Sequence, residues 1–317
     1  MQYRNILLLL AAWFTLYSAN AFAQNDTVRI MQYNLLNYGN SGNPYSYKDQ
    51  RLKAILDHSQ PDIFGANEIG GSSAHSQNIL NAVLGSGWEK AAYSNQSGEI
   101  QTNMLFWKAD KFALKQQQLV SYNVRDIIAY TLYYRDVNLP VTKDTIFVTI
   151  IVAHLKAGDA PSDESRRNLE TQTVVNYLYS LGVRGNYIFM GDFNVYSSSE
   201  PCYSNLVNAI NPNSKLYDPI NKPGAWTANS SFAAYHTQST RNSNMPDGGA
   251  SGGLDDRFDQ ILVSDQLMQG NKKMKYLANT YTAVGQDGNH YNRSVNASPA
   301  NNSAPGNVIQ ALYEMSD

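Results

Sequence analysis

The sequence predicts an α+β fold in which helices cover a sandwich of mixed β-sheets. Runs typical of strands and runs typical of helices follow one another without strict alternation, which favours separate layers over a βαβ repeat. The strongest strand, residues 144–155, is apolar at nearly every position, so both of its faces should be buried. The chain has 317 residues, which is enough for one domain of this kind.

The individual strands are predicted from short runs that are rich in β-branched and aromatic residues. In chain order they are residues 28–35, 62–68, 102–107, 112–120, 127–134, 144–155, 187–190 and 258–263. Helices are predicted where apolar residues recur every three to four positions, at residues 47–58, 75–84 and 166–181. Two segments rich in Gly, Asn and Ser are predicted to be loops, residues 241–253 and 285–306.

The first 23 residues have the pattern of a secretory signal peptide. Arg4 provides a short basic start, an apolar run follows from Ile6 to Tyr17, and Ala21-Phe22-Ala23 forms a small-residue cleavage site. A membrane anchor would need a longer apolar run followed by a basic cluster. We therefore expect an exported protein, secreted or periplasmic, whose mature domain comprises residues 24–317.

Composition limits the partners and the stabilising chemistry. The chain carries 24 basic and 26 acidic residues, a net charge of −2, so no overall positive field attracts nucleic acid. A nucleic-acid substrate would have to be held by a local patch or by bound cations. Cys202 is the only cysteine, which excludes an internal disulfide. We expect it to be a packed cysteine on a helix, and we assume a monomer.

Polar residues recur at the ends of the predicted apolar strands. They are Asn34, Glu68, His154, Asp192, Asn194 and Asp259. Taken singly, each has an ordinary structural explanation: a turn, an exposed strand end, a satisfied core histidine, or an acid paired with Arg257 or with a neighbouring backbone group. Buried carboxylates and imidazoles are costly unless they are paired or bound to something. A common hydrolytic site therefore explains the whole set better.

These residues stand in motifs that resemble those of the endonuclease/exonuclease/phosphatase superfamily, in the same order and over nearly all of the mature chain. The most specific match is Gly191-Asp192-Phe193-Asn194. The other matches are Tyr33-Asn34, the strand ending Asn67-Glu68, the segment 103–108, His154-Leu155-Lys156-Ala157 and Arg257-Phe258-Asp259-Gln260-Ile261. The resemblance implies a four-layer α/β/β/α sandwich of two mixed β-sheets and a metal-dependent phosphoesterase.

The resemblance also implies a role for each residue. Glu68, helped by Asn34, would hold Mg²⁺, or else Mn²⁺ or Ca²⁺, through oxygen ligands. Asp192 would orient or deprotonate the attacking water, and Asn194 would fix its position or bind phosphate. His154 would donate to a non-bridging oxygen. Phosphate would also contact Arg125, for which Arg135 is a rival, and Asp259 would support a catalytic histidine.

The sequence departs from the family pattern at its last motif, Ser-Asp-His-x-Pro. Ser316-Asp317 matches the first two residues, and the next residue would be the histidine. We expect that the catalytic histidine and the last strand lie beyond Asp317, which would itself belong to the catalytic set. The alternative is that His290 takes the histidine's role.

The predicted function is hydrolysis of phosphodiester bonds, with a nucleic acid as the favoured substrate. One alternative is a lipid or sugar-phosphate phosphodiesterase or phosphatase, because one fold supports several substrates. A lipid substrate would call for an exposed aromatic loop, for which Gly224-Ala225-Trp226 is a candidate. The other alternative is a non-catalytic binding module, which would apply if the chain ends at Asp317.

Overall fold

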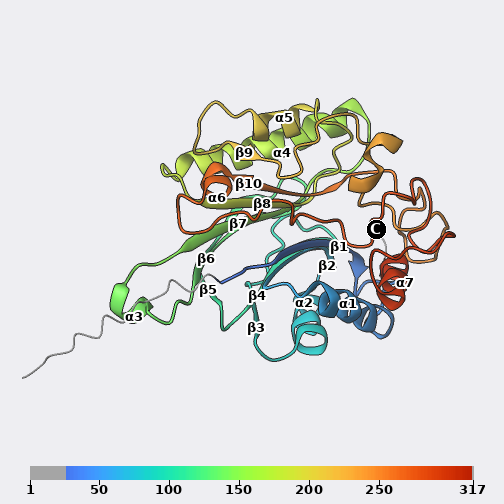
Figure 1. The fold of residues 1–317 in the computed structure, drawn as a ribbon, viewed down its shortest axis with the longest axis horizontal. Helices are drawn as coiled ribbons and strands as arrows, with labels where there is room; N and C mark the ends of the chain where they lie inside the picture. The colour runs from blue at the N-terminus through green and yellow to red at the C-terminus, as the bar shows by residue number, and fades with distance from the viewer. Residues whose placement is uncertain (1–25, 316–317) are drawn as a thin grey trace, which may run out of the picture.

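Two β-sheets lie face to face in the computed structural model, which describes residues 26–315 (Figure 1). The strands of the smaller sheet are, in spatial order, β1 (Ile30–Tyr38), β2 (Ile63–Gly70), β4 (Gln101–Lys108) and β3 (Trp88–Lys90). Those of the larger sheet are β5 (Phe112–Ser121), β6 (Ile127–Tyr134), β7 (Phe147–His154), β8 (Asn186–Asp192), β10 (Asp259–Ser264) and β9 (Leu216–Tyr217). Both sheets are mixed, because β1 pairs with β2 and β7 with β8 in parallel, while the other pairs are antiparallel.

Helices cover the outer face of each sheet (Figure 1). Beside the smaller sheet lie α1 (Tyr45–Ser59), α2 (Ser73–Asn78), the π-helix η1 (Ile79–Leu84) and α7 (Gly306–Met315). Beside the larger sheet lie α4 (Pro161–Ser180) and α5 (Pro201–Val207). The remaining short helices are α3 (Leu139–Thr142), the 3₁₀-helix η2 (Ser230–Tyr235) and α6 (Asp265–Gln269). This arrangement confirms the predicted four-layer α/β/β/α sandwich.

The central strands separate two apolar cores, as their sequences predict. On β8, Ile188 and Met190 face the smaller sheet, whereas Tyr187 and Phe189 face α4 and α5. This alternation is the two-residue period of a strand with both faces buried. The core beneath α4 and α5 also contains Trp226, whose side chain is fully buried. Trp226 is therefore a core residue, as a single tryptophan more often is, and does not serve as an exposed aromatic anchor for lipid.

Most predicted elements are confirmed, with shifts at their ends that have local causes. The helix expected at 166–181 begins five residues earlier, at Pro161, because proline suits the first helical position. The negative charges of Asp163 and Glu164 in the first turn also interact favourably with the positive end of the helix dipole. The helix expected at 75–84 is divided into α2 and η1. Cys202 is buried on α5, as expected.

The two predicted loops are irregular, and a buried ion pair anchors the first. In the first loop the guanidinium of Arg241 pairs with Asp247, and both side chains are buried. The second loop leads into α7, which packs against α1, where Lys48 Nζ donates to the carbonyl of Met315 at 2.8 Å.

Two expectations fall on residues outside the described range. These are the signal peptide at residues 1–23 and the role of Ser316-Asp317. Within residues 26–315, no helix is both long and apolar enough to cross a membrane.

Candidate active site

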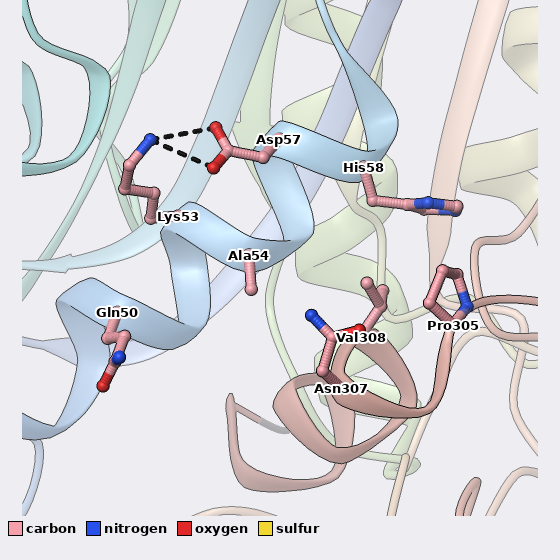
Figure 2. A pocket seen from close by; sticks show the side chains of 8 residues that line it. All are labelled: Gln50, Lys53, Ala54, Asp57, His58, Pro305, Asn307 and Val308. Atoms are coloured by element: carbon pink, nitrogen blue, oxygen red, sulfur yellow. Dashed lines mark hydrogen bonds and ion pairs between the residues drawn. The ribbon is translucent and has the colours of Figure 1, made fainter.

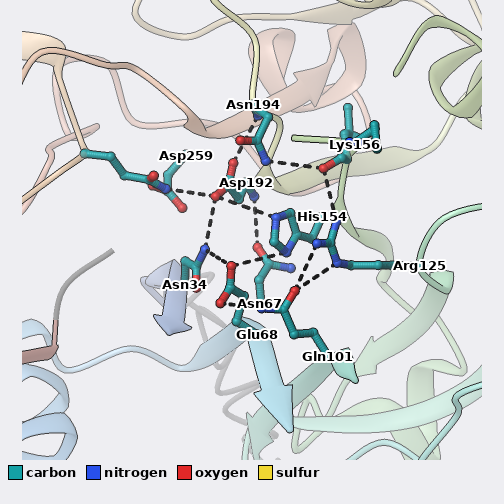
Figure 3. A network of polar contacts seen from close by, with 12 residues as sticks. Asn34, Asn67, Glu68, Gln101, Arg125, His154, Lys156, Asp192, Asn194 and Asp259 are labelled. Carbon is teal, nitrogen blue, oxygen red and sulfur yellow. Dashed lines mark hydrogen bonds and ion pairs between the residues drawn. The ribbon is translucent and has the colours of Figure 1, made fainter. Parts of the chain in front are cut away.

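Strand pairing brings the predicted residues to one end of both sheets (Figure 3). In the smaller sheet, parallel pairing sets Asn34 beside Asn67, which precedes Glu68. In the larger sheet, His154 lies beside Asp192 on the neighbouring parallel strand, and Asp259 lies beside Asp192 on the antiparallel one. The site therefore forms where the two sheets meet.

Two neighbouring strands of the smaller sheet, β1 and β2, are irregular at the site. The pairing of β2 with β4 shifts between Ala66 and Ile69, and Glu68 within this bulge has a φ of +54°. A left-handed backbone is unfavourable for glutamate, and such strain is concentrated at functional sites. The β1 strand shifts its pairing after Asn34. There the backbone N–H of Asn37 donates to Glu68 Oε2 at 3.2 Å. The bulges thus orient the Glu68 carboxylate.

Asn34 joins acids from the two sheets. Its Nδ2 donates to Glu68 Oε1 at 3.2 Å and to Asp192 Oδ2 at 3.1 Å. The backbone N–H of Leu36 donates to Asn34 Oδ1 at 3.0 Å, which fixes which side of the amide faces the acids. A direct hydrogen bond therefore joins Asn34 and Glu68, the two residues that we expect to share a metal site.

Arg125 reaches the site through a glutamine. Its Nη2 donates to Gln101 Oε1 at 2.9 Å, and Gln101 Nε2 donates to Glu68 Oε2 at 2.7 Å. Arg125 lies beside His154 in Figure 3. The rival, Arg135, follows the opposite end of β6, where its Nε donates to the carbonyl of Phe112. The structure therefore favours Arg125 as the arginine of the site.

His154 lies between the two acids. Its Nδ1 is 3.9 Å from Glu68 Oε1, and its Nε2 is 4.0 Å from Asp192 Oδ2. The ring is buried, and among the described residues Nδ1 has no hydrogen-bond partner. Burial lowers the pKa of His154, although the charge of Asp192 acts in the opposite direction. A neutral imidazole with a free nitrogen is thus available to a ligand.

The Gly191-Asp192-Phe193-Asn194 segment places two polar side chains at the end of β8. A Cβ atom on Gly191 would lie 1.7 Å from the carbonyl oxygen of Ala153, so only glycine fits here. The backbone N–H of Asn194 donates to Asp192 Oδ1 at 3.0 Å. Asn194 Nδ2 donates to the carbonyl of Leu155 at 3.2 Å. The backbone of Asn194 has a φ of +50°, which asparagine tolerates better than most residues.

Asp259 contacts Gln238 and not Arg257. Gln238 Nε2 donates to Asp259 Oδ2 at 3.0 Å, whereas Arg257 forms a two-bond ion pair with Asp218. Within residues 26–315, Asp259 Oδ1 is buried without a hydrogen-bond partner. Burial, reinforced by the charge of Asp192, raises the pKa of Asp259 to about 7. The explanation of Asp259 as the ion-pair partner of Arg257 was therefore wrong.

Three amides that were not predicted as site residues hold this site together. Asn67 accepts from the backbone N–H of Asp192 at 2.9 Å and donates to the carbonyl of Ala153 at 3.1 Å, so it bridges the sheets. Gln101 links Arg125 to Glu68, as described above. Gln238 comes from the irregular segment before the first predicted loop. Asn67 could have been suspected from its place beside Glu68, but nothing in the sequence marks Gln238.

His290 is a structural residue in this fold. Its Nδ1 contacts Asp287 Oδ1 at 2.9 Å, and its Nε2 contacts the carbonyls of Ala297 and Pro299 at 2.9 and 3.0 Å. All three partners are acceptors, so both ring nitrogens carry protons and neither is left for catalysis. The alternative that His290 replaces the catalytic histidine was therefore wrong.

The site has the charge and the donor atoms that suit a divalent cation. Glu68, Asp192 and Asp259 bring three carboxylates to this end of the sheets, although the three do not converge as ligands of one ion. Within the described residues their only partner at ion-pair distance is His154, whose pKa is lowered. Hard cations prefer such oxygen donors, and uncompensated buried carboxylates are costly. No three His, Cys, Asp or Glu side chains in residues 26–315 form a metal-binding group. A bound ion would therefore keep water or substrate oxygens, as Mg²⁺ usually does.

An open hollow between α1 and α7 lies apart from this cluster (Figure 2). It is lined by Gln50, Lys53, Ala54, Asp57, His58, Pro305, Asn307 and Val308. Its charged groups, Lys53 and Asp57, form an exposed ion pair at 3.0 Å. None of the site residues described above lines the hollow, so we place the chemistry at the junction of the sheets.

Comparison with known proteins gives one family. The model of the Endonuclease/Exonuclease/phosphatase family matches residues 31–272. No curated protein matches the chain.

Solved structures share the fold at low sequence identity. A family protein from Bacteroides thetaiotaomicron is 18% identical, with a TM-score of 0.50 over 75% of this chain and 83% of the other. One from Bacteroides vulgatus is 16% identical, with a TM-score of 0.52 over 75% and 87%. The structure of D. rerio TDP2 complexed with single strand DNA product is 11% identical, with a TM-score of 0.50 over 75% and 83%.

Proposed function

Since the chain belongs to the endonuclease/exonuclease/phosphatase family, we propose that it is an exported, Mg²⁺- or Mn²⁺-dependent phosphoesterase that hydrolyses phosphodiester bonds in nucleic acid. The observation that carries this proposal is the bridge from Asn34 to both Glu68 and Asp192, with His154 within 4.0 Å of the same two acids. Export is supported by the signal-peptide pattern at the N-terminus.

Each side chain has a task that its contacts suit. Asp192 accepts a proton from the attacking water or orients it, because its carboxylate is held by three hydrogen-bond donors. His154, neutral and with an unpartnered Nδ1 among the described residues, donates a hydrogen bond to a non-bridging phosphoryl oxygen. Asn194 and Arg125 both donate to the carbonyl of Leu155, beside His154 (Figure 3), and are suited to bind phosphate oxygens.

Glu68 is the residue best placed to hold a cation. Its carboxylate is oriented by Asn34, Gln101 and the backbone of Asn37. A divalent ion bound there supplies charge neutralisation for the phosphoryl group. Asn34 contributes by fixing Glu68 and Asp192 relative to each other.

Nucleic acid is the substrate that we favour. An exported enzyme of this family suits the degradation of extracellular DNA or RNA, and the fold is shared with a protein whose structure holds a single-strand DNA product. The net charge of −2 means that affinity has to come from the cation and from local groups such as Arg125. The buried Trp226 leaves the lipid alternative without its candidate loop.

The test is hydrolysis by the mature protein. Plasmid DNA, RNA, sphingomyelin and a chromogenic phosphodiester are offered with Mg²⁺, with Mn²⁺ and with chelator. We expect metal-stimulated cleavage of nucleic acid, and its loss in Glu68→Ala and Asp192→Ala proteins that remain folded by circular dichroism. No turnover with either metal would favour the binding-module alternative, and full activity in both variants would refute the site.

A further inference from the structure

A single amide group connects the two carboxylates of the larger sheet. Gln238 Nε2 donates to Asp192 Oδ2 at 2.9 Å and to Asp259 Oδ2 at 3.0 Å. Both amide hydrogens are therefore used on acids, and the Gln238 side chain is buried. No other described residue contacts both of these carboxylates through hydrogen bonds.

The two acids need such a bridge because of their register. Asp192 on β8 and Asp259 on β10 are directly opposed on antiparallel strands, a position in which like charges destabilise a sheet. Neither has a Lys or Arg at ion-pair distance within residues 26–315. A neutral amide lowers the repulsion between the two acids and leaves both of their charges in place. A lysine or arginine would instead neutralise one of them.

The segment that carries Gln238 is itself held firmly. The Gln238 N–H donates to the carbonyl of Asp256 at 3.1 Å, and its carbonyl accepts from the N–H groups of Asp255 and Asp256, both at 2.9 Å. The neighbouring Thr237 Oγ1 accepts from the Asp259 N–H at 3.1 Å. The backbone around Gln238 is thus tied to the residues that lead into β10, which fixes the point from which its side chain reaches the two acids.

The Gln238 contact also decides which part of Asp192 stays free. A carboxylate has about four lone-pair positions. In Asp192, Oδ1 accepts from the Asn194 N–H, and Oδ2 accepts from Asn34 and from Gln238. Among residues 26–315 these donors occupy three positions, so the remaining lone pair lies on Oδ1 and is the one available to receive the water proton.

We propose that Gln238 is a positioning residue that fixes the Asp192 carboxylate for attack and holds Asp259 beside it. The inference rests on the proposed function, in which Asp192 handles the attacking water. Gln238 touches neither substrate nor cation in this proposal. It acts through the two acids, and its removal lowers the rate of the chemical step rather than substrate binding.

The test compares Gln238→Met, which keeps the length but removes both donors, with Gln286→Met. Gln286 Nε2 donates to the carbonyl of His236, so this matched control loses a bond to the same segment without touching an acid. We expect kcat of Gln238→Met to fall on the order of 10- to 100-fold with KM within about threefold, as for a misplaced catalytic group. Gln286→Met should keep the wild-type kcat.

A second readout does not depend on turnover. In protein with ¹⁵N-labelled glutamine, the Nε2 resonance of Gln238, identified by its loss in Gln238→Met, should shift in Asp259→Asn, whereas the Nε2 resonance of Gln286 should stay in place. If the wild type hydrolyses no substrate, the proposed function fails, and this resonance alone decides whether the amide bridge exists. Wild-type kcat in Gln238→Met, or an unmoved Gln238 resonance in Asp259→Asn, would overturn the inference.

Discussion

Replacing Asn67 with alanine should weaken the protein by separating the two sheets at the site. Asn67 is fully buried, and its side chain contacts the Asp192 N–H, the Ala153 carbonyl and Asn103 Oδ1. The change leaves two backbone groups of the larger sheet without this partner. A buried polar group that loses its partner costs about 1–3 kcal/mol. We therefore expect the free energy of unfolding to fall by about 2–6 kcal/mol, a large share of the ~5–15 kcal/mol typical of a domain.

The measurement is urea unfolding followed by fluorescence. It is combined with kcat on the substrate that the hydrolysis test identifies. Asn186→Ala is the control, because Asn186 donates to the carbonyls of Phe147 and Lys272 and bonds nothing in the smaller sheet. Both variants should be destabilised, but only Asn67→Ala should also lose activity at urea concentrations where it is still folded. A loss below about 1 kcal/mol for Asn67→Ala would show that the cross-sheet bonds contribute little.

Three further predictions concern buried titratable groups. Burial raises the pKa of Glu170 from 4.5 to about 7, so the folded state keeps this proton to a higher pH than the unfolded state does. The free energy of unfolding should therefore fall as pH rises across that range. Glu170→Gln should flatten this slope in urea titrations, and an unchanged slope would contradict the assignment. Desolvation lowers the pKa of His290, but Asp287 and the two carbonyls outweigh it, so the pKa is raised on folding. The charged imidazolium therefore contributes its full share to the free energy of unfolding below the unfolded-state pKa, and this share is lost as pH rises through the folded-state pKa. The melting temperature of His290→Asn should therefore lie below that of the wild type at pH 5.5 by more than at pH 8.5, and an equal difference at both would count against the charged pair. Burial raises the pKa of Cys202 to about 12, so iodoacetamide should label it at pH 8 only after denaturation, and rapid labelling of native protein would show that α5 opens.

The sequence predicts what periodicity and strand ends can encode. The run at residues 144–155 shows that a strand is buried on both faces, and the polar residues after such strands mark the edge where Glu68, His154 and Asp192 meet. Periodicity cannot encode the contact between the sheets, because the alignment of one sheet over the other depends on side-chain packing. Asn67 could therefore be read as a strand residue but not as a cross-sheet bridge.

Gln238 was beyond prediction for a different reason. It lies in an irregular segment that has no repeating pattern, and its position depends on backbone bonds to Asp255 and Asp256. The same holds for the bulge at Glu68, because a left-handed glutamate is unfavourable in isolation and is maintained by its surroundings. Local sequence rules fail where the surrounding fold imposes the conformation.

The site draws its acids from two sheets that, within residues 26–315, share no backbone hydrogen-bond ladder. Glu68 belongs to the smaller sheet and Asp192 to the larger, and the interior between them is closed by interlocking side chains such as Met190, whose terminal methyl would lie 2.3 Å from a Cβ placed on Gly65. Sliding one sheet over the other would change the distance between the acids while each sheet kept all of its own strand pairing. The spacing of these acids therefore depends on side-chain interlock across the interior, and under the proposed function a repacked core would remain folded and yet be inactive.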